Sequence, residues 1–257
     1  MALLRIDSIS KSFGGVTAIA DLSFDVPEGK VYAVIGPNGA GKTTLFNMLC
    51  GIYTPDEGSI RFRESEIVTL PPHQVAALGV SRTFQNLQMF FNMSVLDNVK
   101  VGAHLRSRTP LWSAALRLPQ TRHEERQADN WAREALSFCG LEEYLRSEAD
   151  ALPYGVLKRV EIARALAAAP KLLLMDEPAA GLNDTETKEM RALIRRISES
   201  GITVLLVEHN MGLVMDVSDR ILVIDYGSRL AEGTPKQIQN DPAVIQAYLG
   251  GEVQYAI

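Results

Sequence analysis

Apolar and polar residues recur with strand-like spacing in the first and last thirds of the chain. Residues 4–7 and 22–26 alternate apolar and polar side chains, as strands with one buried face do. Residues 31–35, with the sequence VYAVI, are apolar on both faces and indicate a central parallel strand. By these patterns we predict strands at residues 4–7, 22–26, 31–35, 172–175 and 204–207, and a hairpin at residues 221–231.

The middle of the chain, residues 85–169, has no clear strand pattern. Residues 129–138 carry large apolar side chains toward one side, which predicts an amphipathic helix. Residues 156–169 predict another, ended by Pro170, and residues 43–50 predict a third with Gly51 at its left-handed C-cap. The simplest architecture for residues 1–257 is an α/β core, from residues 1–84 and 170–257, interrupted by a helical subdomain over residues 85–169.

The composition is that of an ordinary globular protein. Of 257 residues, 46% are hydrophobic and 22% are charged, which allows a real core. The formal net charge of −5 disfavours nucleic acid as a partner, because phosphate contacts require a basic excess. Cys50 and Cys139 lack the spacing of a zinc site, which predicts reduced core thiols. The apolar runs are strand-length, below the ~20 residues of a membrane span, so any membrane role requires a partner.

Residues 36–43 (GPNGAGKT) match the phosphate-binding pattern G-x-x-x-x-G-K-[ST] at every fixed position. Glycines let backbone N–H groups curl around an anion, and the helix that follows directs its positive end at the phosphates. Lys42 supplies a charge to the β- and γ-phosphates, and the Thr43 hydroxyl is a ligand for Mg²⁺. The predicted nucleotide-binding residues are Gly36, Pro37, Asn38, Gly39, Ala40, Gly41, Lys42, Thr43 and Thr44.

Three polar side chains follow two other apolar strands. Asp176 and Glu177 come directly after residues 172–175, and ligands bind at the carboxyl ends of such strands. Asp176 is placed to hold the Mg²⁺ shell, and Glu177 to polarise the attacking water as general base. His209 follows the strand at residues 204–207, within reach of a γ-phosphate. Solvated acids and a structural histidine are the alternative, which the phosphate-binding loop disfavours.

In their order along nearly the whole chain, these motifs resemble the ATPase subunits of ABC transporters. The resemblance implies a P-loop NTPase core of the RecA-like type, with an antiparallel β subdomain, an inserted α-helical subdomain, and transport-coupled hydrolysis of ATP. Residues 36–43 then look like the Walker A loop. The further roles implied are Asp176 as Walker B aspartate and Mg²⁺ ligand, Glu177 as catalytic glutamate, Gln85 as Q-loop glutamine near Mg²⁺ and water, Asn183 in the D-loop, His209 as switch histidine, and Phe13 stacked on adenine. For Phe13, an edge-strand core position is the alternative.

The signature loop departs from the family pattern. Members commonly carry L-S-G-G-Q before a helix with R-x-x-I-A-R-A-L, whereas residues 152–156 read LPYGV and residues 159–166 read RVEIARAL. Since the family completes each ATP site across a dimer, Pro153, Tyr154, Gly155 and Val156 are expected at the partner's nucleotide. Pro153 offers a γ-phosphate neither hydroxyl nor N–H, and Val156 has no amide. The resemblance therefore favours pairing with a second, different ATPase subunit.

The sequence of the signature loop and the end of the chain narrow the resemblance to one subfamily. Residues 177–183, 207–211, 225–227, 231–235 and 247–250 look like those of branched-chain amino-acid importer ATPases. That likeness implies transmembrane permease subunits and, indirectly, a periplasmic or extracellular solute-binding protein, with this subunit peripheral at the cytoplasmic face of the membrane. Import of urea, amides or another small solute is the alternative. A DNA-linked ABC ATPase is disfavoured, because no coiled-coil or zinc insertion separates the motifs.

An apolar stretch follows the predicted Q-loop glutamine. Its flexible and aromatic side chains suit a groove for a short cytoplasmic helix of the permease, or else the core of the helical subdomain. The pattern leaves both interpretations open for Leu87, Met89, Phe90, Phe91 and Met93.

Overall fold

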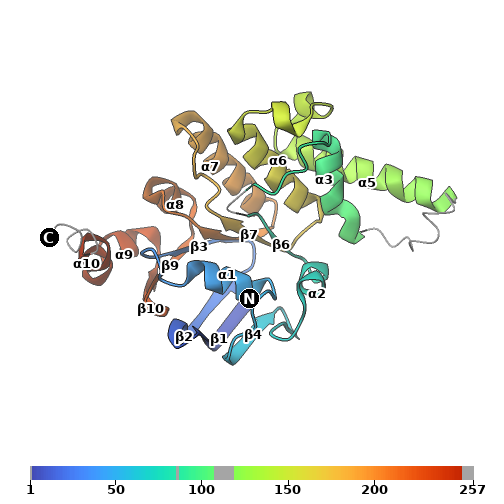
Figure 1. The fold of residues 1–257 in the computed structure, drawn as a ribbon. Coiled ribbons are helices and arrows are strands. Elements are labelled where there is room, and N and C mark those ends of the chain that lie inside the picture. Colours follow the sequence, from blue (N-terminus) through green and yellow to red (C-terminus); the bar gives the residue numbers. More distant parts are fainter. Residues whose placement is uncertain (1, 85–86, 107–118, 251–257) are drawn as a thin grey trace.

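The computed structural model describes residues 2–84, 87–106 and 119–250. Two β-sheets and a group of helices form layers (Figure 1). The larger sheet has the order β10-β9-β3-β8-β7-β6 and is parallel except for the β9–β10 hairpin. Its strands are β3 (Val31–Ile35), β6 (Val80–Arg82), β7 (Leu172–Asp176), β8 (Thr203–Val207), β9 (Arg220–Asp225) and β10 (Ser228–Gly233).

The register of this sheet brings the carboxyl ends of three strands to one edge. Val207 of β8 pairs with Val34 of β3 on one side and with Asp176 of β7 on the other. The residues that follow β3, β7 and β8 therefore leave the sheet next to one another. These are the glycine-rich loop, the predicted pair of acids and the segment with His209, so the sheet itself assembles the site.

A smaller antiparallel sheet lies below the larger one in Figure 1, with the order β2-β1-β4-β5. α1 (Lys42–Leu49) lies between the two sheets, and its Leu45 and Phe46 are fully buried in the core that the layers share. The strands are β1 (Ala2–Phe13), β2 (Val16–Pro27), β4 (Glu57–Phe62) and β5 (Ser65–Glu66).

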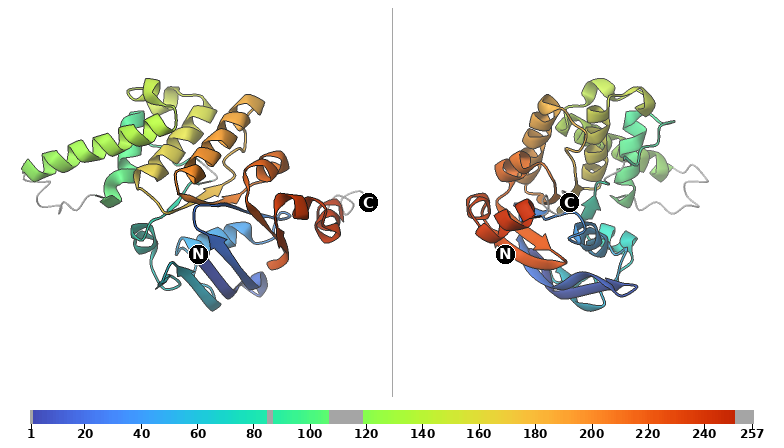
Figure 2. Two further views of the ribbon diagram at one scale, coloured as in Figure 1. Left: turned by 180° about the vertical axis from the view of Figure 1, so that it is seen from behind. Right: turned by 60° about the vertical axis from the view of Figure 1, so that its left-hand side comes forward.

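The opposite face of the larger sheet packs on helices. Alternate strand residues such as Ala33 and Leu206 belong to a second core, formed with α3, α5, α6, α7 and α8. Figure 2 shows these helices on one side of the sheet and the antiparallel strands on the other. The helices are α2 (Pro72–Ala77), α3 (Val95–Ala103), α5 (Pro119–Phe138), α6 (Tyr154–Ala167), α7 (Asp184–Glu199), α8 (Met211–Val217), α9 (Pro235–Gln239) and α10 (Pro242–Gly250), with 3₁₀ turns at His104–Arg106, Glu142–Tyr144 and Ala149–Ala151.

The strands and the hairpin predicted from hydrophobic spacing are confirmed, and β1 and β2 are longer than predicted. The three predicted helices are also confirmed, although α5 begins at Pro119. Gly51, which follows the C-cap Cys50, has a φ of +72°, the left-handed conformation expected just past the end of α1. Within the described part of residues 85–169, β-structure is limited to an isolated bridge between Ser94 and Glu148. β5 and β6 have two and three residues, too few to show an alternation in the sequence.

Candidate nucleotide site

The glycine-rich loop connects β3 to α1. At two of its glycines, the backbone of another segment lies so close that a side chain would collide with it. Gly41 has a φ of +102°, and a Cβ on it would lie 2.4 Å from the carbonyl oxygen of Ala18. A Cβ on Gly36 would lie 2.0 Å from the carbonyl oxygen of Ile224. Gly41 is the N-cap of α1 and gives no side-chain cap, so the first N–H groups of the helix are left to bind an anion.

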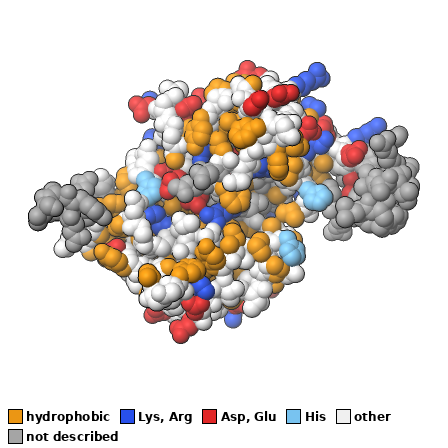
Figure 3. Space-filling model, viewed as in Figure 1, with side chains coloured by type: hydrophobic (Ala, Val, Ile, Leu, Met, Phe, Trp, Pro, Cys, Tyr) orange, Lys and Arg blue, Asp and Glu red, His pale blue; other side chains and the backbone are white. Residues whose placement is uncertain are grey.

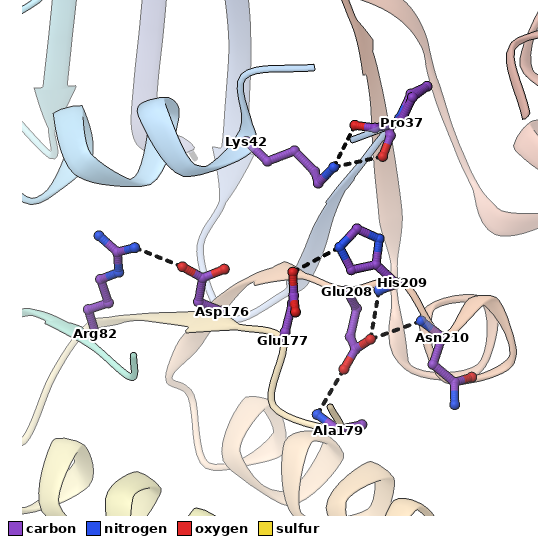
Figure 4. A network of polar contacts seen from close by, with 10 residues as sticks. Pro37, Lys42, Arg82, Asp176, Glu177, Ala179, Glu208, His209 and Asn210 are labelled. Carbon is purple, nitrogen blue, oxygen red and sulfur yellow. Dashed lines mark hydrogen bonds and ion pairs between the residues drawn. The ribbon is translucent and has the colours of Figure 1, made fainter. Parts of the chain in front are cut away.

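Lys42 lies under this loop with a side chain that is almost completely buried. Its Nζ donates to the carbonyl oxygens of Gly36 at 2.7 Å and Pro37 at 2.8 Å (Figure 4). Burial lowers the pKa of Lys42, and the Glu177 and Asp176 carboxylates raise it in part. The ammonium group is thus held at the mouth of the loop, facing the two acids.

Asp176 is the last residue of β7 and Glu177 follows it, both opposite Lys42 (Figure 4). Asp176 is 4% exposed, and its Oδ2 lies 2.7 Å from the Arg82 guanidinium. Glu177 has a φ of +50°, a left-handed conformation that is uncommon outside glycine, and its N–H donates to the carbonyl of Val207 at 2.8 Å. The bend directs the Glu177 carboxylate to His209, where Oε1 and Nε2 are 2.8 Å apart. The sheet edge therefore unites the acids, the lysine and the histidine that the sequence predicted.

Glu208 is a buried residue of this site that the sequence analysis missed. Its carboxylate accepts three backbone hydrogen bonds, from Ala179 at 2.8 Å, His209 at 2.7 Å and Asn210 at 2.9 Å. These bonds tie the segment after Glu177 to the segment that carries His209 (Figure 4). The only signal in the sequence was a charged residue directly after a fully apolar strand.

Arg82, the last residue of β6, was also missed, because this three-residue strand shows no pattern in the sequence. One side of its guanidinium donates to Asn47 Oδ1 at 2.7 Å and the other to Asp176 Oδ2 at 2.7 Å. The guanidinium carbon lies 5.5 Å from the centre of the Phe46 ring and 5.7 Å from that of Phe84. Arg82 therefore connects α1, β7 and the residues that precede position 85.

The remaining predicted nucleotide contacts surround this centre. Thr43 and Thr44 lie in the first turn of α1, and Asn38 and Gly39 are exposed at the tip of the loop. Phe13 ends β1 with 42% of its surface exposed and packs edge-on to Tyr53, so the structure does not support the alternative of a core position. Gln85 lies outside the described residues, although its neighbour Phe84 donates its N–H to Glu161 at 3.0 Å.

The predicted signature loop forms the start of α6. Pro153 is the N-cap without a side-chain hydrogen bond, and Tyr154 is 44% exposed beside Gly181. Gly155 and Val156 are buried, so the Val156 side chain faces the core and not the outside. Asn183, the predicted D-loop residue, caps α7 by accepting from the N–H groups of two following residues.

Among the described residues, no helix has the length and apolar character needed to cross a membrane.

Comparison with known proteins places the chain in one family. Residues 19–180 match the family model described as ABC transporter, and residues 228–254 match that described as branched-chain amino acid ATP-binding cassette transporter. The high-affinity branched-chain amino acid transport ATP-binding protein BraF of Pseudomonas aeruginosa is 45% identical over 96% of this chain and 98% of its own. LivG of Escherichia coli (strain K12), which carries the same description, is 43% identical over the same shares of the two chains.

A solved structure agrees with these relatives. The ADP conformation of an ATP-binding cassette from an ABC transporter has 34% identity and a TM-score of 0.85, covering 97% of this chain and 99% of its own. Fold, motifs and relatives agree on the α/β class of P-loop NTPase and on a nucleotide as ligand. The chain belongs to the ABC transporter family, as an ATP-binding subunit with ATPase activity.

Proposed function

We propose that this chain powers an importer of branched-chain amino acids from the cytoplasmic face of the membrane. The family model at the end of the chain and the descriptions of BraF and LivG support this solute class. The partners would be permease subunits, a second ATPase subunit and, indirectly, a solute-binding protein. Uptake of labelled leucine and urea in cells lacking the gene tests the solute. Loss of urea uptake alone would favour the alternative.

The observation that supports the chemistry is the group of side chains at the carboxyl edge of the sheet. The glycine-rich loop and Lys42 would hold the phosphates, with Phe13 on the adenine. The Thr43 hydroxyl and one Asp176 oxygen are hard oxygen donors of the kind that Mg²⁺ takes together with phosphates and water. Bound there, Mg²⁺ would neutralise charge on the β- and γ-phosphates. Gln85 would complete this shell.

Glu177 is the proposed general base. Its carboxylate would accept a proton from the water that attacks the γ-phosphate, while His209 at 2.8 Å fixes its orientation. Glu177→Gln keeps the shape and removes the base, so ATP binding persists while hydrolysis in the assembled transporter falls roughly 10²–10⁴-fold. Glu199→Gln, at an exposed position ending α7, is the control. Undiminished turnover of Glu177→Gln would refute this assignment.

The proposed permease contact is a groove between the core and the helices, with a volume of about 770 Å³. Five large apolar side chains that line it are 41–50% exposed: Ile52, Phe84, Phe90, Val101 and Leu105. Hydrophobic side chains gather on this face between α2 and α3 (Figure 3). An amphipathic helix from the permease would bury them. Of the stretch left open by the sequence, Met89 and Phe90 both line the groove, but Met89 is buried in the core while Phe90 is 46% exposed.

Phe90 and Phe91 form a matched pair for testing this contact. Both are exposed to a similar degree, 46% and 49%, but only Phe90 lines the groove. Phe90→Ala is expected to weaken co-purification with the permease and Phe91→Ala to leave it unchanged. Equal binding by both variants, with normal thermal stability, would exclude the groove as the docking site.

The signature loop supports a second, different ATPase subunit, because the exposed Pro153 presents no hydroxyl or N–H at the surface. We propose that residues 85–169 move against the core, residues 1–84 and 170–257, when two subunits close on ATP. Closure would bring Pro153 and Tyr154 to the partner's nucleotide, with Asn183 near the contact. Co-expression with each candidate partner, followed by size-exclusion chromatography of the Glu177→Gln variant with ATP, tests the pairing. A stable dimer of this chain alone would overturn it.

A further inference from the structure

Arg82 is held in place on several sides. Its side chain is 10% exposed, one half of its guanidinium bonds Asn47 and the other half bonds Asp176. The Phe46 and Phe84 rings lie near the guanidinium at 5.5 and 5.7 Å. A guanidinium fixed by two hydrogen bonds and two rings has little freedom to turn, so it fixes the carboxylate that it binds.

The Asp176 carboxylate has one oxygen on Arg82 and one that points away from it. Oδ2 takes the guanidinium at 2.7 Å, while the other oxygen points toward the side where Glu177 lies (Figure 4). Asp176 is followed directly by a second carboxylate, and both lie within electrostatic range of Lys42. Without the guanidinium, repulsion from Glu177 would turn the buried carboxylate away from the sheet edge.

We propose that Arg82 is a positioning residue for the metal of the nucleotide. By holding Oδ2, it directs the second oxygen of Asp176 to the edge where Mg²⁺ is expected, before nucleotide arrives. The inference rests on the proposed function of Asp176.

The test measures metal dependence of nucleotide binding on the full chain, without hydrolysis. A fluorescent ATP analogue is titrated in EDTA and at increasing Mg²⁺ concentration. For Arg82→Gln we expect affinity in EDTA within twofold of wild type and at least a fivefold rise in the Mg²⁺ concentration that gives half of the metal-dependent gain. Arg82→Lys keeps the positive charge but lacks the forked guanidinium. Its half-saturating Mg²⁺ concentration should therefore lie between those of wild type and Arg82→Gln.

Unchanged Mg²⁺ dependence in Arg82→Gln would overturn the proposal. A fall in the half-saturating Mg²⁺ concentration would also overturn it, because Arg82 would then compete with the metal. Asp176→Asn separates the two claims. If Asp176→Asn keeps full Mg²⁺ dependence, the metal role of Asp176 fails. If it loses that dependence while Arg82→Gln does not, only the role of Arg82 fails.

Loss of a partly buried arginine also affects folding, and a matched variant controls for this. Arg106 lies 3.7 Å from the centre of the Trp131 ring and donates to the carbonyl of Ala167 at 3.3 Å, in the helical layer. Arg106→Gln removes a similar ring-stacked guanidinium and is expected to leave the Mg²⁺ dependence unchanged. An Arg106→Gln shift equal to that of Arg82→Gln would attribute the effect to general destabilisation and refute the positioning role.

Discussion

Removing the Glu208 carboxylate tests whether this buried acid holds the site together. In Glu208→Ala, the N–H groups of Ala179, His209 and Asn210 all lose their acceptor. The bond to Ala179 is buried, and an unsatisfied buried donor costs about 1–3 kcal/mol. The other two bonds are partly buried and can be replaced by water, at a smaller cost of about 0.5–1 kcal/mol each.

The removal also relieves the cost of burying a charge, which offsets part of this loss. We therefore expect a destabilisation of about 2–3 kcal/mol. For a chain of this size, each kcal/mol lowers the melting temperature by about 2–4 °C, which gives a shift of roughly 4–12 °C. Thermal unfolding followed by circular dichroism measures it.

Glu189→Ala is a matched control, since it removes an acid whose side chain is 50% exposed and 3.6 Å from Arg159. Surface pairs of this kind contribute about 0–1 kcal/mol, so its melting temperature should stay within about 4 °C of wild type. If Glu208→Ala has the same melting temperature as this control, the three N–H groups find other acceptors, and Glu208 does not hold the segment after Glu177 to the segment of His209. Hydrolysis should also fall in Glu208→Ala, because His209 loses its backbone anchor.

Three further outcomes follow from the structure. Burial raises the pKa of Glu161, so the folded chain binds the carboxyl proton more tightly than the unfolded chain does. The stability that the protonated carboxyl contributes is therefore lost as the pH rises above 4.5. In urea unfolding, the free energy of unfolding of Glu161→Gln relative to that of wild type should therefore increase between pH 4.5 and 8. A decrease of this difference over the same range would show that the direction is wrong. Burial raises the pKa of Cys139 to about 12, so iodoacetamide at pH 8 should label it only after denaturation. Pro153→Ser adds an N-cap worth about 1 kcal/mol and loses a proline constraint of about 0.4–1 kcal/mol, leaving stability nearly unchanged. A faster ATP hydrolysis by the assembled transporter would then be an effect of the added hydroxyl. An unchanged rate would show that the missing hydroxyl does not limit hydrolysis.

The sequence predicted the centre of the site because local patterns define it. A parallel strand that is buried on both faces reads as an apolar run, and the polar residue after it must lie at the sheet edge. This reasoning located Asp176, Glu177 and His209, and the phosphate-binding motif located Lys42, before the strand order was known. It did not predict that Val156 faces the core, because a loop motif carries no information about which side chains turn inward.

Arg82 and Glu208 escaped for a reason that the fold explains. Glu208 follows an apolar run, whereas Arg82 ends a strand too short to be predicted. A charged side chain at either position is usually solvated, and only its partners show otherwise. Those partners are distant in sequence: Asp176 is 94 residues from Arg82, and Ala179 is 29 residues from Glu208. The register decides both cases, since Arg82 pairs with Leu174, two residues before Asp176, and Val207, directly before Glu208, pairs with Asp176. In a sheet with a phosphate-binding loop, charged residues at the carboxyl ends of neighbouring parallel strands converge on the nucleotide edge. They are therefore better treated as candidate site residues than as solvated ends.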